Sequence, residues 1–385
     1  MKITFDSAAL SRQLSAASRV LNNKNSMPIL DCFLLRVADG GEVLSITASD
    51  TENTLALTCP LVSYEETVPG EGNGFCVKAR LIMDALKEIP SQPVTLTIDP
   101  QTMLIGGRYA NGTFSITGEL ADEYPLPPGM GDGGNILTLP ASQLLEEIEG
   151  TQFALADDEI RPVMTGIFFD ITPEKMICVG TDGRILVRRS TDACEGIVLP
   201  EEPASFILPK KTSVILRALL AKEDGEVRAV FNDKLLFVTA GGFDLHARLI
   251  DGRYPAYQTV IPTDNPYSAS LQTCDLLPAV RRVLTFADKE SALVRITMKT
   301  DVLLLSGSDV NYATSSEESV PCTWNGPDRF AVGIKGGLLI EVLQHLPKEV
   351  DVKMSEPKRP VLFMPAEQDE HTSVLMLIMP MMLPD

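Results

Sequence analysis

The chain has 385 residues, of which 44% are hydrophobic and 22% charged, and its formal net charge is −19. This length predicts roughly two to four domains, and so acidic a chain does not coat nucleic acid with a uniformly basic surface. The N-terminus has no apolar signal core, and no apolar run approaches the ~20 residues that cross a bilayer. We therefore expect a cytoplasmic protein with no membrane contact.

Cysteine and histidine usage argues against disulfides, metals and cofactors. The seven cysteines are odd in number, widely spaced and form no CxxC pair, which is typical of reduced thiols. The three histidines, His246, His345 and His371, are equally scattered. The sequence therefore predicts no metal site and no cofactor.

In chain order, the first predicted elements recur three times. An apolar residue ends a strand-like segment and leads into a helix at residues 5–10, 139–144 and 271–276, so the starts are 134 and 132 residues apart. One face of each helix follows steps of four, three and four residues, as a 3.6-residue period requires. These faces are Leu10, Leu14, Ala17 and Leu21; Leu144, Ile148, Thr151 and Leu155; and Leu276, Val280, Val283 and Ala287.

A second pattern recurs inside each repeat and consists of a strand, a basic turn and another helix. The strand and turn lie at 75–80, 207–211 and 331–335, and the helices that follow are predicted to contain residues 81–89, 214–220 and 338–346. Further strands, with the clearest alternation in the first two, are predicted at 43–47, 94–98, 227–231 and 303–307. Alternation at period two is typical of half-buried antiparallel strands.

These elements predict an α+β protein of three repeated domains, each with two helices packed on antiparallel sheets. The predicted domains are 1–128, 135–262 and 263–385. Proline- and glycine-rich linkers at 126–135 and 262–266 separate them. A closed symmetric assembly of such similar units makes a ring, in which helices can line one side and sheets the other.

The charge distribution is compatible with a ring around a polyanion. The six predicted helices, with the basic turns that precede three of them, carry a summed formal charge of +5 over residues 7–21, 78–90, 141–156, 209–222, 274–287 and 333–346, which leaves −24 on the rest of the chain. The first helix of the middle repeat is the exception, because it contains Glu146, Glu147 and Glu149. A weakly basic lining suits sliding, since phosphate contacts are independent of sequence and exchange easily.

Two motifs look functional but have the wrong surroundings. Asp182 has no partner acid, base or metal-ligand cluster, and Asp182-Gly183 is more simply a tight turn. The glycine-rich segment 70–74 does not join a strand to a helix start, and no GK[ST] follows it. We expect no catalytic residue and no enzymatic activity.

Several segments in order resemble one known family over essentially the whole chain. They are residues 26–30 (SMPIL), 151–154 (TQFA), 161–166 (RPVMTG), 181–184 (TDGR), 249–255 (LIDGRYP) and 378–381 (IMPM). Together with the threefold repeat, they resemble the bacterial β sliding clamp, the processivity factor of DNA polymerase. The resemblance implies three domains of the DNA-clamp fold and a head-to-tail homodimer that encircles duplex DNA. It also implies a ring that tethers the replicative polymerase, the clamp loader and other replication and repair proteins.

The resemblance further implies three sets of functional residues. A pocket between the second and third domains takes a short partner peptide, as an apolar cleft with adaptable methionines can. The matching pocket positions are Met164, Thr181, Gly183, Arg184, Leu186, Pro255, Thr259, Val260, Leu377, Ile378, Met379, Pro380, Met381 and Leu383. The matching DNA-contacting positions are Lys24, Arg80, Lys210 and Lys211. At the dimer seam, Phe114 and Ile116, which alternate like edge-strand residues, meet Phe286 of the other subunit.

The chain departs from the family pattern at two places. Many members have arginine where this chain has Ile185. The ending Met382-Leu383-Pro384-Asp385 differs from the usual basic-then-leucine terminus and is two residues longer. Both departures could shift peptide preference without removing the pocket.

Two other hypotheses remain at this point. The first is a three-domain hydrolase or transferase that uses Asp182 at a domain junction, which predicts convergent acids and a deep pocket. The second is a scaffold that binds proteins but not DNA through its acidic surface. Loss of DNA retention on mutating Lys24 and Arg80 separates the clamp from this scaffold.

Overall fold

The computed structural model describes residues 1–383 except 23, 26, 67–73, 132 and 159. Of the glycine-rich segment 70–74, residues 70–73 therefore lie outside the described residues, and only Gly74 is described. The chain forms two compact units, Met1–Leu145 with Val214–Leu249, and Glu146–Ser213 with Ile250–Asp385. This division passes through the predicted middle domain, so the three predicted domain ranges remain a proposal.

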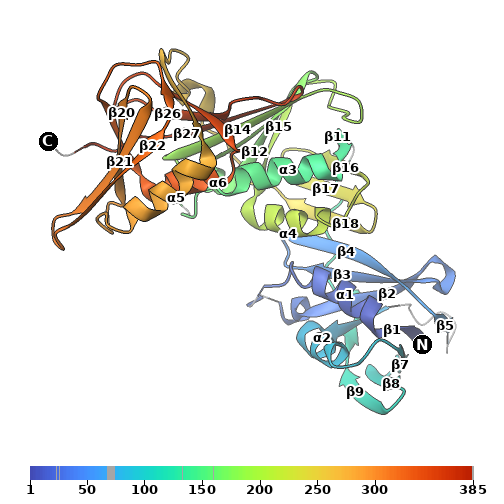
Figure 1. The fold of residues 1–385 in the computed structure, drawn as a ribbon. Coiled ribbons are helices and arrows are strands. Elements are labelled where there is room, and N and C mark those ends of the chain that lie inside the picture. Colours follow the sequence, from blue (N-terminus) through green and yellow to red (C-terminus); the bar gives the residue numbers. More distant parts are fainter. Residues whose placement is uncertain (23, 26, 67–73, 132, 159, 384–385) are drawn as a thin grey trace. The chain divides into compact units, whose positions relative to one another are not determined.

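The first unit contains two antiparallel sheets (Figure 1). The five-stranded sheet has the order β5-β1-β7-β8-β9, and the nine-stranded sheet has the order β10-β6-β2-β3-β4-β18-β17-β16-β11. The strands of the first sheet are β5 (Ser63–Glu65), β1 (Lys2–Asp6), β7 (Pro93–Ile98), β8 (Leu104–Tyr109) and β9 (Gly112–Thr117). Those of the second are β10 (Glu119–Leu120), β6 (Gly74–Lys78), β2 (Cys32–Ala38), β3 (Val43–Ser49), β4 (Asn53–Pro60), β18 (Phe243–Arg248), β17 (Leu235–Ala240), β16 (Glu226–Phe231) and β11 (Asn135–Pro140).

The second unit also contains two antiparallel sheets. The nine-stranded sheet has the order β15-β12-β13-β14-β27-β26-β25-β19-β23, and the four-stranded sheet has the order β22-β21-β20-β24. The strands of the first are β15 (Ala204–Pro209), β12 (Gly166–Ile171), β13 (Lys175–Thr181), β14 (Ile185–Asp192), β27 (Thr372–Ile378), β26 (Val361–Pro365), β25 (Glu349–Met354), β19 (Tyr267–Gln272) and β23 (Thr323–Trp324). Those of the second are β22 (Thr314–Pro321), β21 (Val302–Asp309), β20 (Leu293–Lys299) and β24 (Phe330–Lys335).

Six α-helices lie in the described part of the chain, two in each repeat. They are α1 (Ser7–Ala17), α2 (Ala79–Lys87), α3 (Ala141–Gln152), α4 (Lys210–Leu220), α5 (Thr273–Leu284) and α6 (Gly336–Gln344). The short 3-10 helices are η1 (Pro28–Asp31), η2 (Asp39–Gly41), η3 (Ala121–Glu123), η4 (Pro162–Thr165) and η5 (Tyr257–Val260). In each repeat the first helix directly follows a strand, β1, β11 or β19, as predicted.

The predicted helix faces are confirmed with one correction. Leu10, Leu14 and Ala17 are buried, but Leu21 is only partly buried and Val20 is buried instead. Each first helix continues into turns with i→i+3 hydrogen bonds, and the buried residue lies three positions after the helix end: Val20 after Ala17, Leu155 after Gln152 and Ala287 after Leu284. All members of the second and third faces are buried, and Thr151 satisfies its hydroxyl by donating to the backbone oxygen of Glu147 at 2.6 Å.

The predicted basic turns are the N-termini of the second helices. Lys78 is the N-cap of α2, Lys335 is the N-cap of α6, and Lys210 is the first residue of α4. A helix N-terminus carries partial positive charge, so a cation there gains nothing from the helix dipole. The second helices begin at Ala79, Lys210 and Gly336, next to their basic residues and ahead of the segments that they were predicted to contain.

Candidate functional site

A tight turn joins β13 to β14, which are inner strands of the nine-stranded sheet in the second unit. We call this turn, with the strand ends beside it, the corner. The Asp182 carboxylate accepts from the backbone N–H groups of Arg184 at 2.7 Å and Ile185 at 2.8 Å. Thr181 donates its hydroxyl to the Ile185 carbonyl at 2.6 Å and accepts from the Gly183 N–H at 3.0 Å. Gly183 has φ +86°, a conformation that favours glycine. Asp182 thus builds the turn, as predicted for Asp182-Gly183.

The last strand of the chain pairs with β14 at this corner. Leu186 lies opposite Leu377, Ile185 lies opposite Ile378, and the Met379 N–H donates to the Arg184 carbonyl at 2.8 Å. Adjacent strand residues point to opposite faces. Ile185 and Ile378 therefore enter one core cluster, while Leu186 and Leu377 enter another. Ile185 is only 2% exposed, so this departure from the family pattern changes the core beneath the corner and not its surface.

Two tyrosines hold the segment 254–260 against the same corner. Tyr254 stacks on Phe168 with ring centroids 4.6 Å apart. The Tyr257 hydroxyl donates to Asp170 at 2.9 Å. Burial raises the pKa of both tyrosines, so each hydroxyl stays protonated as a donor. Both rings pack in the cluster that contains Leu186 and Leu377.

Met164 forms part of the floor beside the turn. It lies in η4 and is 4% exposed. The Arg161 guanidinium is 3.7 Å from its sulfur. A Cβ on Gly183 would lie 3.2 Å from that guanidinium and 3.7 Å from the Met164 methyl group. The glycine therefore leaves these two side chains in contact with the turn.

The predicted pocket residues fall into an exposed layer, a buried floor and a C-terminal segment. We call the first two layers together the β14–β27 surface. Its exposed members are Gly183, Arg184, Pro255, Thr259, Val260 and Met379, and its buried members are Met164, Thr181, Leu186, Leu377 and Ile378. The remaining three, Pro380, Met381 and Leu383, are partly buried, and Met381 and Leu383 lie against β24 of the four-stranded sheet.

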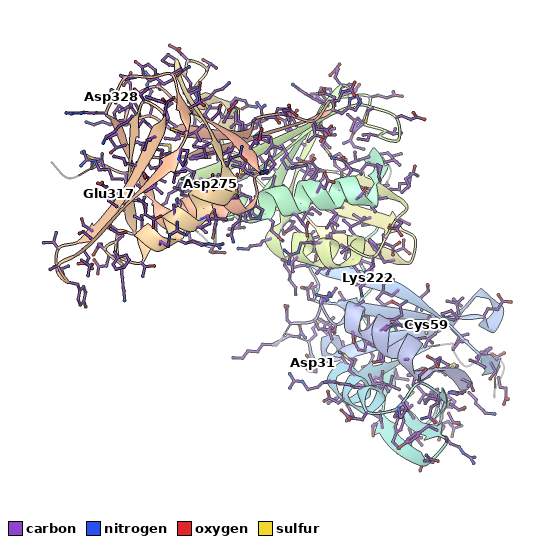
Figure 2. The ribbon with its side chains drawn as sticks, viewed as in Figure 1. Asp31, Cys59, Lys222, Asp275, Glu317 and Asp328 are labelled. Carbon is purple, nitrogen blue, oxygen red and sulfur yellow. The ribbon has the colours of Figure 1, made fainter. Side chains whose placement is uncertain are left out.

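The four predicted DNA-contacting residues are exposed or partly exposed basic side chains. Within the described residues, neither Lys24 nor Arg80 has a carboxylate within 4 Å. Arg80, in the first turn of α2, lines a cavity of about 520 Å³. Asp31, which is labelled in Figure 2, also lines it. Lys210 forms an ion pair with Asp157 and lies beside Lys211. Hydrogen bonding from Lys210 lowers the pKa of Asp157.

A further basic group lies between α1 and the end of α4. Arg12, Arg19 and Lys222 line a second cavity, of about 480 Å³, together with Glu223. All three cations are exposed, as Lys222 is in Figure 2. These three cations contribute to the predicted helix charges but were not predicted to form a group, because residues about 200 positions apart share no local pattern.

The predicted seam residues lie at sheet edges or beside them. Phe114 and Ile116 belong to β9, which is the edge strand of the five-stranded sheet, so the predicted edge position is confirmed. Phe286 follows α5, is 44% exposed, and accepts through its backbone oxygen from the Thr314 hydroxyl at 3.1 Å. Thr314 begins β22, which is an edge strand of the four-stranded sheet.

The described residues hold neither a metal-binding cluster nor a membrane-spanning helix. No group of three or more His, Cys, Asp or Glu side chains there could hold a metal ion. None of the helices described is long and apolar enough to cross a membrane.

Three family models match the chain in succession. They are described as the N-terminal, central and C-terminal domains of the DNA polymerase III beta subunit, and they match residues 1–128, 138–256 and 258–382. The chain belongs to the DNA polymerase III beta subunit family. Among curated members, the beta sliding clamp of Treponema pallidum is 26% identical over 99% of both chains, and that of Escherichia coli K12 is 28% identical over 90% of both.

Solved structures of sliding clamps share the fold. A Pseudomonas aeruginosa sliding clamp bound to griselimycin has a TM-score of 0.91 at 24% identity, and a Bacillus subtilis sliding clamp has a TM-score of 0.89 at 22% identity. Each of these comparisons covers 100% of both chains.

Within this family fold, the structure adds residues that sequence reasoning missed. Arg161, Tyr254 and Tyr257 support the β14–β27 surface, although none was predicted as a site residue. The recurrent tyrosine-proline ending at Tyr124 and Tyr254 was the available signal. In the first unit Tyr124 is likewise buried, at 3% exposure, so the repeated tyrosine indicates a packing role.

Proposed function

We propose that this sliding-clamp chain forms a head-to-tail homodimeric ring around duplex DNA and holds replication proteins there through the β14–β27 surface. The observation that carries the proposal is the succession of three DNA polymerase III beta domains along one chain that has the sliding-clamp fold. The partners are the replicative DNA polymerase, the clamp loader and other proteins with a clamp-binding peptide. The proposed compartment is the cytoplasm, and no catalytic step is required of the chain.

The ring hypothesis is supported by free strand edges. Edge strands with unpaired backbone groups are templates for pairing with another chain. β9, with Phe114 and Ile116, and β22, beside Phe286, supply one such edge each. A head-to-tail contact between two different surfaces closes into a ring when its rotation permits.

Negative-stain electron microscopy of the purified protein tests this assembly directly. Closed particles with six similar lobes and a hole wide enough for duplex DNA are expected. Compact particles without a hole would rule out encirclement and restore a scaffold that does not bind DNA.

DNA contact is proposed for Lys24 and for the cations in the first turns of α2 and α4, which are Arg80, Lys210 and Lys211. Lys24 and Arg80 have no competing carboxylate among the described residues, and Lys210 shares only the exposed Asp157. Exposed ion pairs contribute little to stability, so Lys210 can exchange Asp157 for a phosphate. A Lys24→Ala/Arg80→Ala variant should reduce the slope of log K against log salt concentration for duplex binding by the amount expected for about two lost phosphate contacts. Lys175→Ala/Lys299→Ala is the matched control on strand ends.

Peptide binding is proposed for the exposed side chains over the buried apolar floor. An apolar floor with a few polar groups, here Thr181 and Arg184, suits a short peptide anchor. Griselimycin, to which the P. aeruginosa clamp is bound, serves as a probe. Removal of residues 379–385 should abolish griselimycin binding in calorimetry while ring formation persists. Unchanged binding by the truncated protein would refute this site.

A further inference from the structure

The C-terminal segment is fixed to two different sheets of the second unit. The Met379 N–H donates to the Arg184 carbonyl on the nine-stranded sheet, and the Met381 N–H donates to the Gly333 carbonyl on the four-stranded sheet, both at 2.8 Å. The second contact is an antiparallel bridge to β24, which is an edge strand. The segment therefore crosses from the β14–β27 surface to the open edge of the neighbouring sheet.

Gly333 makes this crossing possible because it lacks a side chain. A Cβ at this position would lie 2.8 Å from the Met381 backbone oxygen, 2.9 Å from Leu293 Cδ1 and 3.0 Å from Leu383 Cδ2. The first contact is with backbone, which cannot rotate away as a flexible side chain can. Gly333 is buried, and it has no left-handed backbone angle, so the requirement for glycine is steric.

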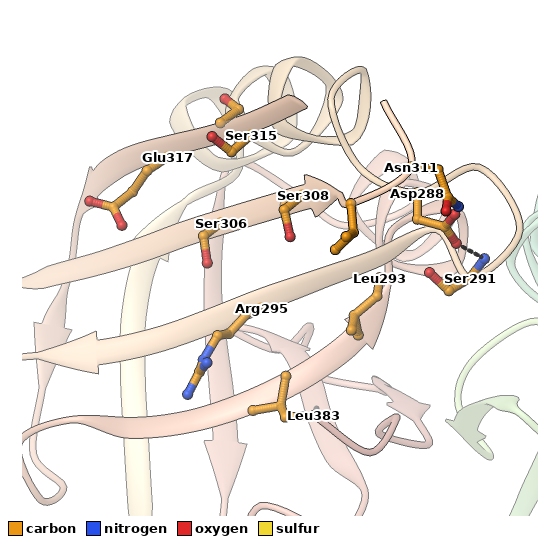
Figure 3. A pocket seen from close by; sticks show the side chains of 13 residues that line it. Asp288, Ser291, Leu293, Arg295, Ser306, Ser308, Asn311, Ser315, Glu317 and Leu383 are labelled. Atoms are coloured by element: carbon orange, nitrogen blue, oxygen red, sulfur yellow. Dashed lines mark hydrogen bonds between the residues drawn. The ribbon is translucent and has the colours of Figure 1, made fainter. Parts of the chain in front are cut away.

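Leu383 occupies the space above this glycine. Gly333 lies opposite Arg295 in the sheet, so the missing side chain would share a face with Arg295. Leu383 lines a groove of about 590 Å³ on that face, near Leu293 and Arg295 (Figure 3). The residue before it, Met382, is 80% exposed. The tail is thus anchored by Met381 and Leu383, while Met382 makes little contact.

We propose that Gly333 and Leu383 are positioning residues for partner peptides, a role that rests on the proposed peptide-binding function. They hold the C-terminal segment so that Met379, which is 41% exposed, stays over the β14–β27 surface. A chain terminus without such anchors frays, and ordering it upon binding costs conformational entropy. Leu383 then acts through the segment that it anchors and not by touching the peptide.

Two substitutions with matched controls test this role. Gly333→Ala adds one methyl group beneath the Met381 carbonyl, whereas Gly337→Ala, in α6, adds the same group where nothing lies within 4 Å. Leu383→Ala removes the anchor, whereas Met382→Ala shortens its exposed neighbour. In calorimetry with griselimycin, Gly333→Ala and Leu383→Ala should bind about tenfold more weakly than the parent, which corresponds to about 1.4 kcal/mol. The two controls should stay within about twofold of it.

Methionine methyl NMR of the free proteins separates positioning from general damage. The Met379 and Met381 methyl signals should move in Gly333→Ala and Leu383→Ala before any ligand is added, while the thermal midpoint stays near that of the parent. Parent-like affinity in both variants, or weaker binding with unmoved signals, would overturn the positioning role. Failure of the parent to bind griselimycin would instead remove the proposed peptide surface itself, and the positioning role with it.

Discussion

Helices α3 and α5 take equivalent places in two repeats, and their comparison separates what the fold requires from what charge adds. Each lies directly on a strand glycine. A Cβ on Gly180 of β13 would lie 2.4 Å from the Thr151 backbone oxygen, and a Cβ on Gly307 of β21 would lie 3.2 Å from the Val283 backbone oxygen. Thr151 and Val283 are the third members of the two predicted helix faces. The repeat therefore preserves close helix–sheet packing.

The charged partners of the two helices differ in burial. The Glu147 side chain of α3 is fully buried, accepts from Arg189 at 3.2 Å and accepts from the Thr191 hydroxyl at 2.9 Å. On α5, Arg282 donates to Glu318 of β22 at 2.8 and 2.7 Å, and the arginine side chain is 60% exposed. One pair is thus part of the core and the other lies at the surface.

This difference also accounts for part of the acidic charge on α3. Three glutamates on α3 are contrary to the expected basic lining. One of them, Glu147, is buried and forms an ion pair with Arg189. Glu146 lies 3.6 Å from the same Arg189. Glu149 is exposed, with no ion-pair partner among the described residues. The effective acidity of the helix surface is therefore smaller than its sequence indicates.

The largest effect is expected from breaking the buried pair. Arg189→Met leaves the Glu147 carboxylate buried without its counter-charge, and such a break costs about 3–5 kcal/mol of unfolding free energy. Urea unfolding measures this loss. Arg217→Met, the same change at an exposed position on α4, should stay within about 0.5 kcal/mol of the parent.

A second substitution distinguishes lost charge pairing from lost packing. Glu147→Leu added to Arg189→Met removes the stranded carboxylate, so most of the lost stability should return. A double variant no more stable than Arg189→Met would show that the pair matters through shape or through Thr191, and not through burial of an unpaired charge.

A smaller effect is expected from the polar member of the α3 face. Thr151→Val removes the hydroxyl that donates to the Glu147 carbonyl, and loss of one such hydrogen bond costs about 1 kcal/mol. Val283 occupies the matching position on α5 without any hydroxyl, so the fold tolerates the change. A loss above about 3 kcal/mol in urea unfolding would mean that the hydroxyl supports the buried pair as well.

The exposed charges of the two helices should affect DNA binding by a factor of a few. Arg281→Glu on α5 should weaken binding to a short labelled duplex and reduce its salt slope by about one phosphate contact. Glu149→Lys on α3 should act in the opposite direction. Lys175→Glu, at the first residue of β13, controls for net charge. Equal effects of all three substitutions in proportion to charge alone would contradict a specific helix lining.

Local periodicity was enough to predict how each repeat begins. The three strand-to-helix starts and nearly all members of the helix faces are as predicted, because one apolar face at a 3.6-residue period is visible within a dozen residues. Leu21 was wrong because α1 ends one residue earlier relative to its face than α3 and α5 do, so Val20 takes the buried position.

Long-range partners were not visible in the sequence. Glu147 and Arg189 lie 42 residues apart in sequence, and no spacing rule connects them. Ile185 was singled out only as a departure that could shift peptide preference, and its pairing with Ile378 buries it. Which face a strand residue takes depends on the register with a strand nearly 200 positions away, and that register is a property of the folded sheet.

The smallest effect is expected from the exposed pair on α5, and its pH dependence sharpens the comparison. The hydrogen bond from Arg282 lowers the pKa of Glu318 below its usual value, so the pair stabilises the fold at neutral pH. That contribution disappears as the pH falls through the pKa of Glu318 and the carboxylate is protonated. Arg282→Ala should therefore shift the urea midpoint barely at pH 7 and not at all in acid. A clear destabilisation by Arg282→Ala that persists in acid would show that the arginine stem packs on β22. The difference in burial between the two ion pairs would then not be enough to explain their different contributions to stability.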